Sequence, residues 1–302
     1  MDGQDLYIHW IASSGRQGGQ GAATGLFPYW SFTKTAISVC VLKLVEAGAL
    51  DLDACVTGQT YTLRQLLRHE AGLPDYGPLA DYHAAVARGD NPWPRDRLLA
   101  VACRREMLHK PGQGWSYSNL GYLFLREILE DATGEPLGDI IALLICRPLG
   151  LRSVTLWESR AQSALLHWPA AAGYDPGWVY HGCLIGTAAD AARLLHGLFA
   201  GDLLQPRTLQ QMLDTRPLGA AIAGRPWTRY GYGLGLMSGA WRRLGTAVGH
   251  SGAGPFGVTA IYHFPDLPDP LTVACFAPGT REDRAERAAA TVAECHRAQR
   301  TD

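Results

Sequence analysis

The pattern of apolar positions predicts a long buried helix early in the chain. Over residues 33–47 the apolar side chains follow the helical period, at Ile37, Cys40, Val41, Leu44 and Val45. Gly48 follows as a typical helix stop. Because the segment is apolar on most of its surface, we expect this helix to lie at the centre of the fold.

Further helical segments fill the middle of the chain and are separated by turns rich in Gly and Pro. We expect helices over residues 61–70, 95–107 and 120–133. Another begins at Pro136 and must end before Pro148, because proline cannot donate a helical hydrogen bond. The stretch 187–190 has capping-box spacing and predicts a helix that runs to about Ala200.

Strand-like runs stand at the two ends of the chain. Residues 6–12 form one, and the glycine-rich segment 13–25 that follows is a turn or hairpin, not a phosphate-binding loop. Beyond Tyr230 we expect strands and then a closing helix, at residues 231–238, 246–251, 257–264, 271–277 and 281–300.

These elements predict an α+β fold. Its antiparallel sheet is built from N- and C-terminal segments and flanked by helices, and a mainly helical region is inserted between them. We expect a single domain over residues 1–302, with the sheet part at about 1–30 and 228–302 and the helical region at about 50–200.

Composition narrows the classes of partner. Charged residues make up 18% of the 302 residues and the net charge is −1, so there is no electrostatic footprint for nucleic acid or an anionic membrane. No His/Asp/Glu cluster has metal-ligand spacing, and we expect no metal or other cofactor. Composition leaves the oligomeric state open.

Three features predict a cytoplasmic protein. The 7 cysteines show no C-x-x-C spacing and are typical of reduced thiols. Residues 1–5 lack a basic region and no long apolar stretch follows, although a chain trimmed of its signal peptide would look the same. The apolar run at residues 140–146 is too short to span a membrane.

The first candidate for chemistry is the motif Ser31-Phe32-Thr33-Lys34 at the start of the central helix. Residues three apart share a helix face, so the Lys34 amine can reach the Ser31 hydroxyl. A lysine with a lowered pKa is a suitable base for a serine nucleophile. On its own the motif is more often a serine cap followed by a surface lysine.

The second candidate is Tyr117-Ser118-Asn119, in a turn-rich loop before an amphipathic helix. Alternate side chains of such a loop can enter one cleft. There Tyr117 can pass protons when cations depress its pKa, and Asn119 can hold a substrate carbonyl or amide. The structural alternative is that Tyr117 packs in the core and Asn119 caps the helix.

The third candidate is His250-Ser251-Gly252, on a predicted strand. Gly252 lets a substrate backbone approach the strand edge. The backbone N–H of Ala253, together with that of Ser31, is a candidate oxyanion hole. His250 and Ser251 also have an ordinary structural interpretation, as a hydrogen-bonded histidine and a strand residue.

In this order the three motifs resemble the serine hydrolases of the class C β-lactamase and D-alanyl-D-alanine carboxypeptidase family, which includes esterases and D-aminopeptidases. The flanking stretches 63–74, 148–151 and 187–190 agree with it, and the similarity spans roughly residues 30–278. The resemblance implies an inserted-helix transpeptidase-like fold and hydrolysis of a small β-lactam, D-alanyl peptide, amide or ester.

The resemblance also implies a role for each motif residue. Ser31 would form the acyl-enzyme, Lys34 and Tyr117 would share proton transfer, and Asn119 would orient the substrate. His250 would line the site opposite Tyr117, while Ser251, Gly252 and Ala253 would contact the substrate. His250 replaces the lysine of true class C β-lactamases and is largely neutral at pH 7. This departure favours peptidase or esterase activity over β-lactam hydrolysis.

Two alternatives stay open. The stretch 249–253 nearly matches the nucleophile elbow of α/β-hydrolases, which would make Ser251 the nucleophile of an esterase. That elbow requires a helix directly after it, whereas a strand pattern follows here. The other alternative is a penicillin-binding-like protein that has kept the fold and lost turnover.

Overall fold

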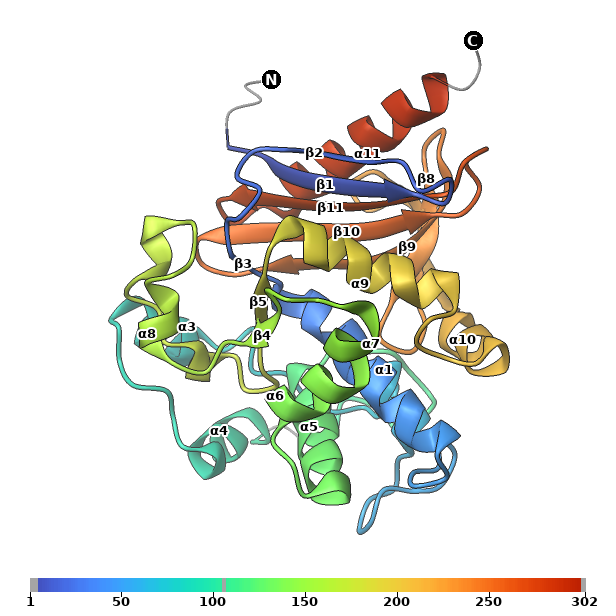
Figure 1. The fold of residues 1–302 in the computed structure, drawn as a ribbon. Helices are drawn as coiled ribbons and strands as arrows, with labels where there is room; N and C mark the ends of the chain where they lie inside the picture. The colour runs from blue at the N-terminus through green and yellow to red at the C-terminus, as the bar shows by residue number, and fades with distance from the viewer. Residues whose placement is uncertain (1–4, 105–106, 300–302) are drawn as a thin grey trace.

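The computed structural model describes residues 5–104 and 107–299. Its main sheet has eight antiparallel strands in the order β2-β1-β11-β10-β9-β8-β7-β6. Strand β1 pairs with β11, so the N- and C-terminal segments lie side by side (Figure 1). This arrangement confirms the predicted α+β fold. The strands are β1 (Tyr7–Ala12), β2 (Gln17–Gln20), β6 (Arg216–Gly219), β7 (Trp227–Tyr232), β8 (Met237–Trp241), β9 (Gly245–Ala253), β10 (Gly257–Phe264) and β11 (Leu271–Pro278).

Helices cover both faces of the sheet, and the inserted helical region lies below it in the view of Figure 1. Helix α11 packs on one face and α9 on the other. Helix α1 runs through the middle of the helical region, and ten consecutive residues from Thr33 to Leu42 are buried, as its apolar pattern predicts. The helices are α1 (Thr33–Glu46), α2 (Leu63–Leu67), α3 (Ala80–Ala87), α4 (Arg95–Ala102), α5 (Asn119–Thr133), α6 (Leu137–Ile141), α7 (Arg147–Leu149), α8 (Arg160–Ser163), α9 (Ala188–Ala200), α10 (Pro206–Leu213) and α11 (Glu282–Ala298).

A second, small sheet joins the two regions. Its strands β3 (Phe27–Pro28), β5 (Leu184–Gly186) and β4 (Thr155–Leu156) lie in the order β3-β5-β4. The backbone N–H of Leu184 donates to the Thr33 hydroxyl at 2.9 Å, which ties β5 to the first turn of α1. This small sheet therefore holds the start of α1 in place.

The predicted strand over residues 231–238 is wrong. This segment forms the end of β7, a turn and the start of β8, with the Gly233 N–H donating to the Leu236 carbonyl at 2.8 Å. Gly235 has a φ of +77°, which the turn requires. Leu234 and Leu236 are buried although they lie in the turn. The alternation of leucine with glycine in this segment therefore comes from a buried turn and does not indicate a strand.

The prediction that a helix ends before Pro148 is also wrong. A π-helical turn, η2 (Ala142–Cys146), follows α6, and α7 continues through Pro148 to Leu149. A π-turn changes the hydrogen-bond spacing of the backbone, so the missing N–H of a proline in the next turn is tolerated.

Other predicted helices are shorter than expected. Helix α4 ends at Ala102, before the expected end at Met107, which is not helical; residues 105–106 lie outside the described residues. Helix α11 ends at Ala298, and Arg300, its expected end, also lies outside the described residues. The pattern did not predict α3, α10 or β6. In the described part of the chain no helix is both long and apolar enough to cross a membrane.

Candidate active site

The three motifs meet where α1, α5 and β9 converge. Ser31 lies in a 3₁₀ turn, η1 (Trp30–Phe32), which leads directly into α1. Trp30 has a φ of +46°, a strained conformation for a residue other than glycine that is typical of functional sites. On β9, a Cβ at Gly252 would lie 2.7 Å from the Ser31 nitrogen, so only glycine allows this close approach. Ser31 is partly exposed and Lys34 is fully buried.

Three polar groups surround the Lys34 amine. Its Nζ lies 3.3 Å from Ser31 Oγ, 2.8 Å from Asn119 Oδ1 and 3.0 Å from His181 Nε2. Burial lowers the pKa of Lys34 to about 7, and the nearby Asp75 carboxylate opposes part of this change. A substantial fraction of the lysine is therefore neutral near pH 7, as a general base for Ser31 requires.

Asp75 fixes the orientation of Asn119. The Asn119 backbone N–H donates to Asp75 Oδ1 at 2.9 Å, and its side-chain Nδ2 donates to Asp75 Oδ2 at 3.1 Å. An ionised carboxylate only accepts, so the amide nitrogen must face Asp75 and the amide oxygen must face Lys34. Asn119 thus begins α5 and at the same time accepts a hydrogen bond from the lysine amine.

Tyr117 covers the amine from the loop before α5. Its ring centroid lies 5.1 Å from Lys34 Nζ, and its buried hydroxyl lies beside Ser31. Burial raises the pKa of Tyr117 well above its usual value, and contact with the Ser31 hydroxyl offsets only part of this change. The residue therefore stays a neutral phenol that can donate a proton, rather than a phenolate made by nearby cations.

His250 is held as a neutral ring. Its Nδ1 contacts the backbone carbonyl of Ser251, which can only accept, so Nδ1 carries the proton. Its Nε2 then accepts from the Tyr232 hydroxyl at 2.9 Å. Burial, together with Lys34, lowers the pKa of His250 to about 3. The ring centroid of Tyr117 is 6.3 Å away, so the structure brings His250 close to Tyr117.

Ser251 points to the opposite face of the sheet. Its hydroxyl donates to Glu286 Oε1 of α11 at 2.6 Å and lies 2.7 Å from the Tyr262 hydroxyl. Strand β9 continues through Ala253 and pairs with β10, so no helix follows Ser251. This setting rules out a nucleophile elbow. The Ser251 side chain does not reach the cleft, contrary to the expectation that it contacts the substrate.

The backbone N–H of Ala253 lies on the edge of β9 that does not face β10. Gly254 N–H donates to the Gly257 carbonyl at 3.0 Å, and the alternation of the ladder turns the N–H of Ala253 away from β10. On that side β8 pairs with β9 only as far as Gly249, which leaves this edge open. Ala253 is exposed there and follows Gly252, which touches Ser31.

The sequence motifs missed three residues of the site. His181 contacts Lys34, and Asp75 orients Asn119. The ring centroid of His69 lies 4.3 Å from that of Tyr117, with the rings tilted by 37°, and His69 accepts from the Ser118 N–H at 3.1 Å. His69 also has a φ of +60°. Asp75 directly follows the flanking stretch 63–74, which was the available signal for it, whereas no motif points to His181.

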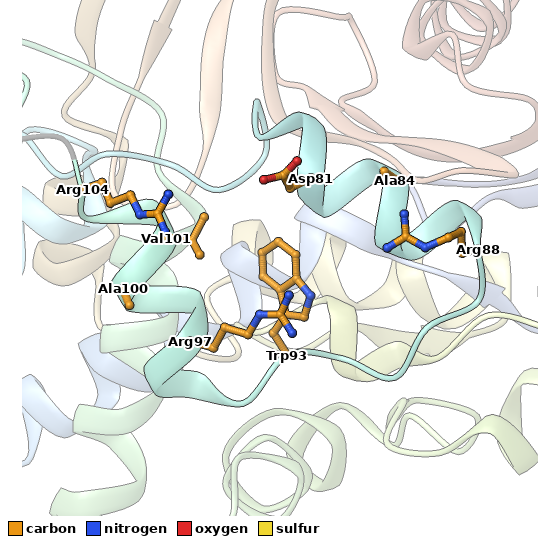
Figure 2. A pocket seen from close by; sticks show the side chains of 8 residues that line it. All are labelled: Asp81, Ala84, Arg88, Trp93, Arg97, Ala100, Val101 and Arg104. Atoms are coloured by element: carbon orange, nitrogen blue, oxygen red, sulfur yellow. The ribbon is translucent and has the colours of Figure 1, made fainter.

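The surface also carries a cavity away from this chemistry. It has a volume of about 400 Å³ and lies between α3 and α4 (Figure 2). The Arg97 guanidinium stacks over Trp93 at 4.7 Å, and Asp81, Arg88 and Arg104 line the rest of its polar wall. None of the three motifs contributes to it. Among residues 5–104 and 107–299, no group of three His, Cys, Asp or Glu residues is arranged to hold a metal ion.

Comparison with known proteins gives one consistent result. A family model described as Beta-lactamase matches residues 2–296. Esterase EstB of Burkholderia gladioli is 27% identical over 266 residues, covering 70% of this chain and 66% of the esterase. Penicillin-binding protein 4* of Bacillus subtilis is 31% identical over 146 residues, covering 45% of this chain and 31% of that protein. The chain thus spans less than two thirds of these relatives.

A solved structure supports the same fold. The D-amino acid amidase from Ochrobactrum anthropi SV3, complexed with L-phenylalanine, superposes with a TM-score of 0.80 at 19% identity and covers 98% of this chain and 94% of that one. At this level of identity the likeness concerns the fold alone.

Proposed function

The chain belongs to the Beta-lactamase family of serine hydrolases, and from this premise we propose that it cleaves small esters or amides through an acyl-enzyme on Ser31. One observation carries the proposal. Lys34 is buried, lies 3.3 Å from Ser31 Oγ, and burial lowers its pKa to about 7. A serine beside such an amine is an activated nucleophile.

In the proposed acylation, Ser31 Oγ attacks the substrate carbonyl while its proton passes to Lys34 Nζ. The backbone N–H groups of Ser31 and Ala253 stabilise the negative oxygen of the tetrahedral intermediate. As that intermediate collapses, Tyr117 donates its phenolic proton to the leaving group and regains one from the Lys34 ammonium. Water then hydrolyses the acyl-enzyme along the same proton route.

The charge at the third motif favours a substrate without a carboxylate beside the scissile bond. Burial and Lys34 keep the pKa of His250 near 3, so His250 contributes no positive charge at neutral pH. A carboxylate placed there would lack a cationic partner. We therefore favour simple esters and amides over β-lactams, in keeping with the names of the similar proteins, which include Esterase EstB and D-aminopeptidase of Cereibacter sphaeroides.

The test combines labelling with a substrate panel. Wild type, Ser31→Ala and Ser251→Ala are treated with a fluorophosphonate and analysed by intact mass spectrometry. We expect wild type and Ser251→Ala to gain one adduct and Ser31→Ala none. The same proteins are assayed on p-nitrophenyl acyl esters, D-amino-acid amides and nitrocefin, and we expect ester or amide turnover to exceed that of nitrocefin. Labelling or unchanged turnover in Ser31→Ala would refute the proposal.

A further inference from the structure

His181 is a buried histidine that the three motifs leave unexplained. It lies between η4 (Pro176–Trp178) and β5, with 3% of its surface exposed. Its Nε2 is 3.0 Å from Lys34 Nζ, as close to the amine as a hydrogen bond requires. In the described part of the structure, its Nδ1 is buried with no hydrogen-bond partner. The contact with Lys34 is therefore the main polar interaction of this ring.

The backbone on both sides of His181 is firmly held. The Tyr180 hydroxyl donates to the Trp93 carbonyl at 3.0 Å, and the Gly182 N–H donates to the Val179 carbonyl at 2.7 Å. Gly182 has a φ of +90°, and a Cβ there would meet Leu156 and Leu137 at 3.1 and 3.2 Å. Two residues further on, Leu184 is bonded to the first turn of α1. The ring is thus placed against Lys34 by a rigid segment.

The number of protons and lone pairs on the amine indicates which partner donates in the Lys34–His181 hydrogen bond. A neutral lysine has two protons and one lone pair, and Lys34 has three polar neighbours. Asn119 Oδ1, fixed by Asp75, can only accept, so one N–H of the amine donates to it. If the second N–H donates to His181 Nε2, the lone pair of the amine is left to accept from the Ser31 hydroxyl. If instead His181 donated to the lone pair, the lysine would not be available as a base.

Burial lowers the pKa of His181 well below its usual value, so the ring is neutral. The positive charges of Lys34 and Arg126 act in the same direction. His250 and His69 also face the ring, but both are buried and neutral. Lys34 itself faces the Asp75 carboxylate and the Cys183 thiol. A neutral His181 whose proton sits on Nδ1 has an Nε2 lone pair directed at Lys34.

We propose that His181 is a positioning residue that accepts the second hydrogen bond of the neutral Lys34 amine and so aims the lone pair of the amine at Ser31 Oγ. The proposal rests on the function proposed above and adds a residue that determines how well the base is oriented. It also makes a distinctive prediction. Because a hydrogen bond from a cation is stronger than one from a neutral amine, loss of the acceptor lowers the pKa of Lys34 as well as the acylation rate.

The test compares His181→Leu, which removes the acceptor, with His181→Gln, whose amide oxygen can replace Nε2. His263→Leu is the matched control, because His263 is also a buried histidine but bonds Thr272 at 2.9 Å, outside the site. The second-order rate of fluorophosphonate labelling is measured from pH 5 to 9, and the folded fraction is measured by circular dichroism.

For His181→Leu we expect the plateau of the labelling rate at high pH to fall about 10- to 100-fold. The acid limb, which is the part of the pH profile where the rate declines as Lys34 is protonated, should move to lower pH. His181→Gln should recover most of the rate and the wild-type limb, and His263→Leu should leave the limb in place. An unchanged rate and limb in His181→Leu would overturn the proposal. So would a lower rate with an unmoved limb that Gln does not rescue, because that pattern indicates only packing.

If His181→Leu does not fold, His181→Met replaces it under the same criteria. The proposed function is judged separately by the Ser31→Ala adduct. If Ser31 is labelled normally in every His181 variant, the function stands and only the positioning role fails.

Discussion

The two faces of strand β9 contact two buried polar clusters, and the ionisable groups of these clusters have different partners. On the face that meets the helical region, His250 lies beside the Lys34 cluster, which comprises Lys34, Ser31, Asn119 and His181. One residue later, Ser251 points to the Glu286 cluster, which comprises Glu286, Arg225, Trp227 and Ser251. Both clusters are buried and polar, but their charges are compensated in different ways.

The Glu286 cluster is compensated directly. Both carboxylate oxygens of Glu286 accept from Arg225, and Oε1 also accepts from Trp227 Nε1 at 3.1 Å and from Ser251 at 2.6 Å. The Glu286 side chain is 0% exposed. A buried carboxylate that meets a guanidinium and fills its remaining lone pairs is stable and has no free capacity for chemistry.

The Lys34 cluster is compensated only indirectly. The amine meets a hydroxyl, an amide and an imidazole, and the carboxylate of Asp75 reaches it through Asn119. Burial therefore lowers the pKa of this lysine to about 7. The comparison teaches that a buried ion bonded directly to its counter-ion stabilises the fold, whereas one held by neutral groups is poised to exchange a proton.

The largest expected effect is the loss of catalysis in Lys34→Met. Without the amine Ser31 has no base, and we expect the acylation rate to fall on the order of 10²–10⁴-fold. In wild type, kcat/KM should decline below about pH 7, where Lys34 is protonated and cannot accept the Ser31 proton. Rate profiles against pH with a p-nitrophenyl ester check both points. A wild-type rate in Lys34→Met would show that the Lys34 cluster, like the Glu286 cluster, takes no part in catalysis.

The next effect is a loss of stability in Glu286→Ala. Arg225 would keep its ion pair with Glu282 at 2.6 Å but lose both hydrogen bonds to Glu286, and we expect unfolding to become easier by about 3–5 kcal/mol. Urea denaturation measures this. Glu286→Gln, which keeps the shape of the side chain, should lose less. The rate at which fluorophosphonate labels folded Glu286→Ala should stay at the wild-type level. A loss of labelling in the folded variant would show that the Glu286 cluster also supports the Lys34 cluster.

A smaller loss is expected for Ser251→Ala. The substitution leaves Glu286 and Tyr262 each without one partner, and we expect a cost of about 1–3 kcal/mol. Ser31→Ala is the matched control on the other face, because its hydroxyl is partly exposed. It should lose labelling with little change in unfolding, the reverse of Ser251→Ala. Equal stability losses in the two variants would contradict this contrast.

The smallest effect, taken over a single pH unit, is a pH dependence of stability. The folded-state pKa of Lys34 is lowered to about 7, so between pH 7 and about 10 the unfolded chain binds this proton and the folded chain does not. Stability conferred by Lys34 therefore rises with pH in this window, by up to ~1.4 kcal/mol per pH unit. From pH 7 to 10 the unfolding free energy of wild type should therefore rise relative to that of Lys34→Met, which lacks the titrating amine. A constant difference would indicate an ordinary lysine.

Much of the fold was predictable because its signals are local. The helical period over α1, the glycine at position 134 after α5 and the threonine that caps α9 each reside in a few neighbouring residues. Thr187 does accept from the Asp190 N–H, as a capping box requires, but the Asp190 carboxylate instead bonds Ser153 and Arg193. The predictions over residues 231–238 and at Pro148 failed because tertiary burial and a π-turn override local patterns.

The sequence by itself determined the ordered motifs, and with them the family and the pairing of Ser31 with Lys34 on one helical turn. The tertiary structure alone decided which neighbours complete the site. His181 lies 147 residues from Lys34, and no local spacing predicts their contact. Strand β9 is buried on both faces from Ala247 to Gly252, so its sequence lacks the alternation that would separate His250 from Ser251. Only the tertiary structure places His250 beside Lys34 and Ser251 on the other face of the sheet, beside Glu286.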